Sequence, residues 1–300
     1  MLYAYTTIWI ACVIGSIVLM TATTAVSNVD AKRQSYCYSS VTNQIGSEVP
    51  VIVGASEAER RFLGVPQLVA IVRSLRETKG PPIFLNADHT HSLPGAVEAA
   101  KAGFDWVVCD FSSLPFEENV RQTKEAVLAL KALRPDILVE GEIGDIGSGS
   151  QIHESAPDIR RTLTTPDEAR QFVEETGIDT LAPAVGTMHG VLRSMLKTDA
   201  KKRLDVPRIQ AIKQRTGMFM TLHGASDTDD ADLRAAIAAG ITVIHISTEL
   251  RLAWRHGIET SFAKQPEEIG PPTLLTPVID AVKCTVGARL ALFSGHEAQH

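Results

Sequence analysis

Three histidines in this chain lie at or just beyond the ends of short apolar runs, and together they could bind a metal ion. His89 directly follows one run, His189 lies a few residues past a second, and His223 lies near the end of a third. Catalytic zinc is held by three protein ligands, with a fourth position left open to substrate. A single histidine at a strand end is usually a hydrogen-bonded structural residue, but three at matching places predict a zinc site.

Other ionisable residues could contribute to the predicted zinc site. Asp88 directly precedes His89, which puts a carboxylate beside the predicted metal, where it could transfer a proton. His91 has the same parity as His89 in an extended chain and is an alternative first ligand. His245, inside a further apolar run, and His153 are weaker metal candidates. We prefer His89 because it follows its run immediately.

Seven apolar runs recur along the chain, nearly continuous in hydrophobicity, which is typical of parallel strands buried on both faces. Helical segments between them end in glycine, and one opens with Thr165 as a cap and Pro166 in its first turn. This alternation predicts right-handed βαβ units. The predicted strands are 50–56, 82–88, 105–111, 137–144, 180–186, 218–224 and 242–248, and the helices include 65–80, 93–103, 165–177 and 230–240.

These units predict an α/β fold, a (β/α)8 TIM barrel with an atypical N-terminal segment. Such a barrel needs about 250 residues, and we expect it over residues 49–300, with a last amphipathic helix at 277–293 packed outside. Residues 1–48 are an atypical apolar leader and a possible first βα unit, whose strand we expect within 10–28. The competing open sheet would need a glycine-rich fingerprint that runs into a helix, and GDIGSGS (144–150) does not run into one.

Composition narrows the function classes. The net charge of −6 gives no basic footprint for nucleic acid. Four cysteines without a CxxC pair favour a reducing compartment without a disulfide framework, with Cys109 as a buried thiol. We therefore expect a cytoplasmic protein that is not bound to a membrane. The uncharged run at 8–26 leaves a membrane anchor or an export signal as the alternative.

Polar residues gather where the predicted strands end. The carboxyl ends of barrel strands converge on one rim, and barrel active sites lie there. Small and hydroxyl-bearing residues after the last two strands leave backbone N–H groups free for an anion, as in many barrel phosphate sites. The rim residues are Ser56, Asp88, His89, Asp110, Glu142, His189, His223, Ser247 and Thr248.

Several motifs occur together in a familiar order. They are NADHTHS, DFSSLPFEEN, VEGEIGDIG, LAPAVGTMHG, LHGAS and HISTELR. From about residue 49 to residue 293, the chain resembles class II, zinc-dependent ketose-bisphosphate aldolases. The resemblance implies a (β/α)8 barrel that reversibly cleaves a ketose 1,6-bisphosphate, of the fructose or tagatose type, into dihydroxyacetone phosphate and an aldehyde phosphate.

The same resemblance implies roles for individual residues. His89, His189 and His223 match the zinc ligands, Asp88 the proton donor to the aldehyde oxygen, and Asp110 and Glu142 a secondary metal position. It also implies a monovalent cation and a homodimer or homotetramer. The segments that match triose-phosphate binding contain Gly190, Gly224, Ala225, Ser226, His245, Ile246, Ser247 and Thr248, and we add the strand-end residue Ser56 to the substrate-binding set.

The remaining expectations concern the base that removes the α-proton and the residues that differ from the family pattern. Zinc would polarise a ketone and spread charge into an enediolate, and we expect Glu154, in the loop 145–163, to remove the α-proton. Ala225 replaces a usual glycine and could crowd a phosphate, while His245 and Ser247 replace the usual Asn and Asp or Asn, which leaves the sugar open. The alternatives are a non-catalytic sugar-phosphate-binding or aldolase-associated subunit, and a different metal-dependent lyase or hydrolase.

Overall fold

A computed structural model describes residues 7–11, 50–77, 83–147, 149–154 and 163–294 of the chain. Within these ranges, strands and helices alternate as the apolar runs predict. The α/β class is confirmed. Most of the leader at 1–48 lies outside the described residues.

Seven parallel strands form the central sheet, in the order β10, β9, β7, β5, β4, β3, β2. Their bounds differ from the predicted ones by only a few residues, because strands buried on both faces give continuous apolar runs that are visible in the sequence. The strands are β2 (Val51–Ser56), β3 (Ile83–Thr90), β4 (Trp106–Cys109), β5 (Leu138–Ile143), β7 (Thr180–Pro183), β9 (Phe219–Leu222) and β10 (Ile241–Ile246).

A further strand, β1 (Thr7–Ala11), pairs in parallel with both edges of this sheet. Its Ile10 is in register with Val53 of β2 and with Ile246 of β10. The prediction of a strand within 10–28 is therefore wrong at its start, since pairing begins at Thr7. Residues 12–28 lie outside the described ranges.

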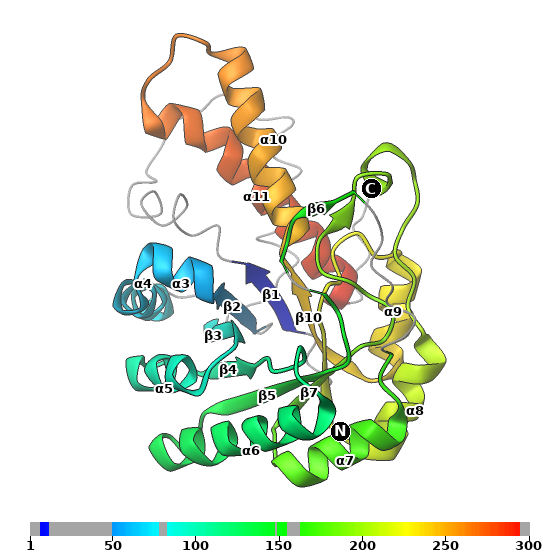
Figure 1. The fold of residues 1–300 in the computed structure, drawn as a ribbon. Helices are drawn as coiled ribbons and strands as arrows, with labels where there is room; N and C mark the ends of the chain where they lie inside the picture. Colours follow the sequence, from blue (N-terminus) through cyan, green and yellow to red (C-terminus); the bar gives the residue numbers. More distant parts are fainter. Residues whose placement is uncertain (1–6, 12–49, 78–82, 148, 155–162, 295–300) are drawn as a thin grey trace.

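The helices lie around the outside of the strands, as Figure 1 shows. Thr165 and Glu168 form the capping box of α7, and Gly177 ends it in a left-handed conformation at φ 72°. The helices are α3 (Glu57–Leu63), α4 (Val65–Glu77), α5 (Leu93–Ala102), α6 (Phe116–Leu133), α7 (Pro166–Thr176), α8 (Val206–Thr216), α9 (Asp230–Ala239), α10 (Thr248–Lys264) and α11 (Pro271–Ser294).

The alternation of side chains along β5 shows how the sheet places carboxylates on its inner face. Gly141 packs against a helix, and a Cβ there would lie 2.6 Å from the ring of Phe172 on α7. Because successive residues of a strand point to opposite faces, Glu140 and Glu142 point away from that helix. Both are buried.

The last two helices, α10 and α11, project beyond the strands (Figure 1). The predicted terminal helix at 277–293 is found, and it begins earlier, at Pro271. Cys109 is free and buried, as predicted. Cys284 is disulfide-bonded, which the expectation of a chain without a disulfide framework did not include. None of the helices in the described ranges is long and apolar enough to cross a membrane.

Candidate metal centre and substrate cavity

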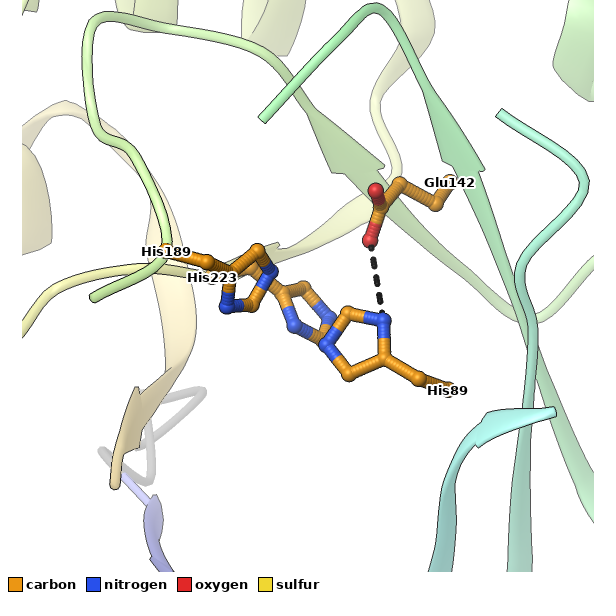
Figure 2. Close-up of side chains that lie close together, drawn as sticks. All are labelled: His89, Glu142, His189 and His223. Atoms are coloured by element: carbon orange, nitrogen blue, oxygen red, sulfur yellow. Dashed lines mark ion pairs between the residues drawn. The ribbon is translucent and has the colours of Figure 1, made fainter. Parts of the chain in front are cut away.

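Four side chains from distant parts of the sequence meet at the carboxyl ends of the strands. His89 belongs to β3, Glu142 to β5, His189 follows β7, and His223 follows β9. One possible ligand atom from each lies within 4.8 Å of the others, and Figure 2 shows the three rings and the carboxylate facing one another. The structure thus brings all three predicted histidines into one possible metal site.

His89 is held in an uncommon backbone conformation. Its φ is +38°, a region that residues other than glycine rarely adopt. The register between β3 and β4 shifts between Ala87 and Thr90, and such irregularities re-aim side chains near active sites. His89 Nδ1 lies 2.8 Å from Asp110 Oδ2. A proton on Nδ1 would therefore bond Asp110 and leave Nε2 available to a metal.

His223 is oriented by Glu140, a residue that the sequence analysis did not select. His223 Nε2 lies 2.6 Å from Glu140 Oε1, and both side chains are 0 % exposed. The other carboxylate oxygen accepts a hydrogen bond from the Thr221 hydroxyl at 2.6 Å. A ligating histidine commonly donates its second N–H to a carboxylate. The sequence could have indicated Glu140, because it lies two residues before Glu142 and therefore on the same face of a buried strand.

The four groups have strongly shifted pKa values. Burial lowers the pKa of His189 to about 3, with a further contribution from charge on His89. Burial also holds the pKa of His223 well below its usual range. Burial by itself would lower the pKa of His89, but the neighbouring carboxylates, Asp88 first among them, raise it well above the usual value. Burial raises the pKa of Glu142 strongly, and the charge of Asp110 adds to this.

The donor set fits a divalent metal such as zinc. His189 Nε2, His223 Nδ1 and Glu142 Oε2 are buried and have no hydrogen-bond partner among the described residues. Buried polar atoms are rarely left without a partner. Neutral imidazole nitrogen and carboxylate oxygen are the ligand types that zinc takes.

Asp88 and His245 lie next to this cluster. The rings of His223 and His245 are 4.0 Å apart, and His245 Nδ1 lies 3.6 Å from Asp88 Oδ1. Burial opposes ionisation of Asp88, but the charge of His89 and the other imidazoles give it a net lowered pKa. Asp88, His223 and His245 form a second set of close ligand atoms. The first set is the stronger candidate for a metal site because it contains three imidazoles.

A cavity of about 370 Å³ opens above the cluster, which is within the usual size of small-molecule sites. Arg61 and Arg251, which the sequence analysis did not select, line its wall together with Glu57 and Glu59, and Arg251 pairs with Glu59 at 2.8 Å. In the sequence, only Arg251 could have been selected as a rim residue, because it follows the last strand by one helical turn. Arg61 had no such signal. The predicted residues that line the cavity are Ser56, Asp88, His89, Asp110, His189, Gly190, His223, Gly224, Ser226, His245, Ser247 and Thr248.

Three predicted substrate residues are placed differently from the simple expectation. The Ser56 hydroxyl lines the cavity, but it also caps α3 and bonds Glu59. Ala225 and Ile246 are buried in the hydrophobic core. The methyl group of Ala225 therefore does not crowd the cavity, and neither residue is among those that line it.

The remaining candidates are not in the set of four close ligand atoms. Glu154 bonds Arg193 at 2.7 Å, its side chain is 73 % exposed, and it is not among the cavity-lining residues. Asp110 and His91 belong to neither set of close ligand atoms in the described ranges; His91 Nδ1 lies 3.1 Å from the Asp110 carbonyl oxygen. His153 lies in the short strand β6 (Ile152–His153), which pairs with β8 (Val191–Leu192).

Comparison with known proteins gives a consistent family. The family model "Fructose-bisphosphate aldolase class-II" matches residues 25–297. A fructose-bisphosphate aldolase of Thermus caldophilus is 33 % identical over 265 residues, covering 81 % of this chain and 84 % of the relative. A probable fructose-bisphosphate aldolase of Bacillus subtilis (strain 168) is 32 % identical over 247 residues, covering 81 % and 83 %. The crystal structure of the YdjI aldolase from Escherichia coli K12 matches with a TM-score of 0.71 and 25 % identity, covering 99 % of this chain and 94 % of that one.

Proposed function

The chain belongs to the class II fructose-bisphosphate aldolase family, and we propose that it is a zinc-dependent aldolase. It would reversibly cleave a ketose 1,6-bisphosphate, of the fructose or tagatose type, into dihydroxyacetone phosphate and an aldehyde phosphate through an enediolate. The observation that carries the proposal is the meeting of His89, His189, His223 and Glu142, with ligand atoms within 4.8 Å of one another.

The proposed ligands are His89, His189 and His223, and Glu142 is the carboxylate that belongs to the same set of close ligand atoms. A divalent ion held by them would act as a Lewis acid toward a ketone oxygen in the adjoining cavity. Glu140 orients His223 through its 2.6 Å contact, and Asp110 orients His89 through its 2.8 Å contact. The secondary metal position expected at Asp110 and Glu142 stays a prediction.

Asp88 is the proposed acid and base for the aldehyde oxygen. It is buried and keeps a lowered pKa, so it is ionised and ready to take the proton of a sugar hydroxyl during cleavage. The α-proton needs a second base, and Glu154 would have to leave Arg193 to act as one. That role stays a prediction.

The cavity offers groups for two phosphates. Gly190, Gly224 and Ser226 line the cavity, and small residues of this kind suit an anion. Arg61 and Arg251 add guanidinium groups, which bind phosphate in a bidentate manner. A substrate with a phosphate at each end would use both kinds of group.

We also propose the finer architecture. β1 would be the eighth strand of a (β/α)8 barrel, because it pairs with both β2 and β10. The barrel would occupy 49–300 together with this N-terminal strand. The homodimer or homotetramer stays a prediction.

Deuterium exchange tests the proposal. Zinc-replete protein should exchange the α-proton of dihydroxyacetone phosphate and cleave a ketose bisphosphate. Asp88→Asn should keep zinc and exchange but lose cleavage by about 10²–10⁴-fold, the usual contribution of a general acid or base. Asp136→Asn, in the exposed turn before β5, is a matched control and should change neither. Wild-type protein that binds no zinc and exchanges no proton would refute the proposal and favour a non-catalytic subunit.

A further inference from the structure

A buried lysine binds the two loops that carry His189 and His223. Lys202 is only 6 % exposed. Its Nζ donates hydrogen bonds to the carbonyl oxygens of Met188 at 2.7 Å, Gly190 at 2.5 Å and Gly224 at 3.0 Å. An ammonium group has three donors and no acceptor, so these three oxygens use its full hydrogen-bonding capacity.

The backbone of Lys202 is also fixed. Its N–H donates to Asp227 O at 3.0 Å, and its carbonyl accepts from Asp229 N–H at 3.1 Å. It forms an isolated parallel bridge with Thr228. Lys202 therefore reaches from one anchored segment to two others, and it cannot move without disturbing all three.

The contacts of the ammonium group resemble those of a bound alkali cation. Rings of backbone carbonyl oxygens replace the hydration shell of K⁺ in proteins. Here, three such oxygens already bond one positive charge that the chain itself supplies. The resemblance to class II aldolases implies a monovalent cation, but at these oxygens an added ion does not fit, because Lys202 Nζ is within 3.0 Å of each.

We propose that Lys202 is a positioning residue whose ammonium group substitutes for a monovalent cation, holding the loops of His189 and His223 in place. Met188 and Gly190 flank His189 in sequence, and Gly224 follows His223, so each loop is held beside its imidazole. Burial lowers the pKa of Lys202 to about 8, while Asp227 and Glu249 oppose this shift. The group is therefore mostly charged at neutral pH.

The same contact orients part of the cavity wall. In a trans peptide the C=O and N–H point in opposite directions. Because Gly224 O points at Lys202, the N–H of Ala225 points away from it. Gly224 has φ +64°, and a Cβ there would lie 2.6 Å from the backbone of Met188. The two loops are thus packed backbone against backbone, with the ammonium group bonded to both.

The test replaces the side chain and offers a cation in exchange. Lys202→Ala removes the ammonium group and leaves room for an ion. Lys201→Ala is the matched control, because Lys201 is adjacent and partly exposed and pairs with Asp227. Wild type and both variants are compared in tetramethylammonium, potassium and ammonium chloride at equal ionic strength. Thermal unfolding and aldolase activity are both recorded.

Wild type and Lys201→Ala should show the same activity and unfolding midpoint in all three salts. Lys202→Ala should lose on the order of 100-fold in activity in tetramethylammonium chloride, the effect of a misplaced site. Potassium or ammonium should then restore part of that activity and raise the midpoint in a saturable way. A structural role alone would not produce this rescue.

Two results would overturn the inference. One is a folded Lys202→Ala protein whose activity and midpoint ignore potassium and ammonium. The other is a wild-type protein that itself needs potassium or ammonium. If Lys202→Ala does not fold in any salt, the cation dependence of the wild-type protein still tests the inference. The inference rests on the proposed function only for its activity readout, because the unfolding midpoint tests it even if the chain has another activity.

Discussion

Replacing Glu140 by Gln would separate the charge of a buried carboxylate from its hydrogen bonds. Glu140 accepts from the Thr221 hydroxyl and contacts His223 Nε2, both at 2.6 Å. A Gln amide oxygen can still accept from His223, and its NH₂ can donate to Thr221 Oγ1, which lies 3.2 Å from another hydroxyl, Thr180 Oγ1. The substitution therefore keeps the shape and the contacts while removing the ionisable group.

The expected effect follows from the raised pKa of Glu140, which burial shifts to about 8. Without metal, Glu140 binds a proton below that pH. Metal binding at His223 Nδ1 favours an Nε2–H that donates to an ionised Glu140, so binding releases the proton and affinity rises with pH. From pH 6 to pH 8 the ionised fraction grows about 50-fold, which is about 2.3 kcal/mol of metal-binding free energy.

The assay is a zinc competition titration against a chromogenic chelator at pH 6, 7 and 8. Glu140→Gln should bind zinc about 10–100-fold more weakly than wild type at pH 8, the usual effect of losing an outer carboxylate. Its affinity should also lack the additional 50-fold rise that Glu140 contributes in wild type. Glu125→Gln, exposed on α6, is the matched control and should behave as wild type.

The reasoning would be refuted if Glu140→Gln and wild type showed the same change of affinity between pH 6 and pH 8. Protonation of His89, whose pKa is raised, contributes a pH dependence common to both proteins. Only the difference between them reports on Glu140. Calorimetry in two buffers of different ionisation enthalpy would count the released protons independently.

Three further outcomes follow from the geometry. His223→Ala should weaken zinc binding by more than the roughly 100-fold expected at Glu140 and should abolish activity; stoichiometric zinc in the purified variant would contradict the ligand set. Gly190→Ala should lower the free energy of unfolding by about 1–3 kcal/mol, because φ is +72° and a Cβ would lie 2.2 Å from a carbonyl oxygen. Gly217→Ala, with φ +69° and open space around it, should cost less in the same urea titration. Deleting residues 1–11 should leave one edge of β2 and one edge of β10 without a partner strand and yield aggregated protein by size-exclusion chromatography, whereas a folded, active truncation would show that β1 is dispensable.

Much of the fold could be predicted because its signals are local. Strands buried on both faces give continuous apolar runs, so β2 to β5, β7, β9 and β10 were expected within a few residues of their observed bounds. Thr165, Pro166 and Gly177 likewise indicate the ends of α7. The strand at Thr7–Ala11 was misplaced, because a short segment inside a long uncharged run has no boundary signal of its own.

The sequence by itself determined that three imidazoles follow separate strands, and the parallel arrangement predicted that they share a rim. Only the tertiary structure decided how they are aimed and supported. The irregularity at His89, the 2.6 Å contact between Glu140 and His223, and the three carbonyl oxygens around Lys202 join residues 12 to 83 positions apart. Such contacts depend on the register of neighbouring strands and the packing of loops, which are properties of the whole sheet and leave no pattern in a short stretch of sequence.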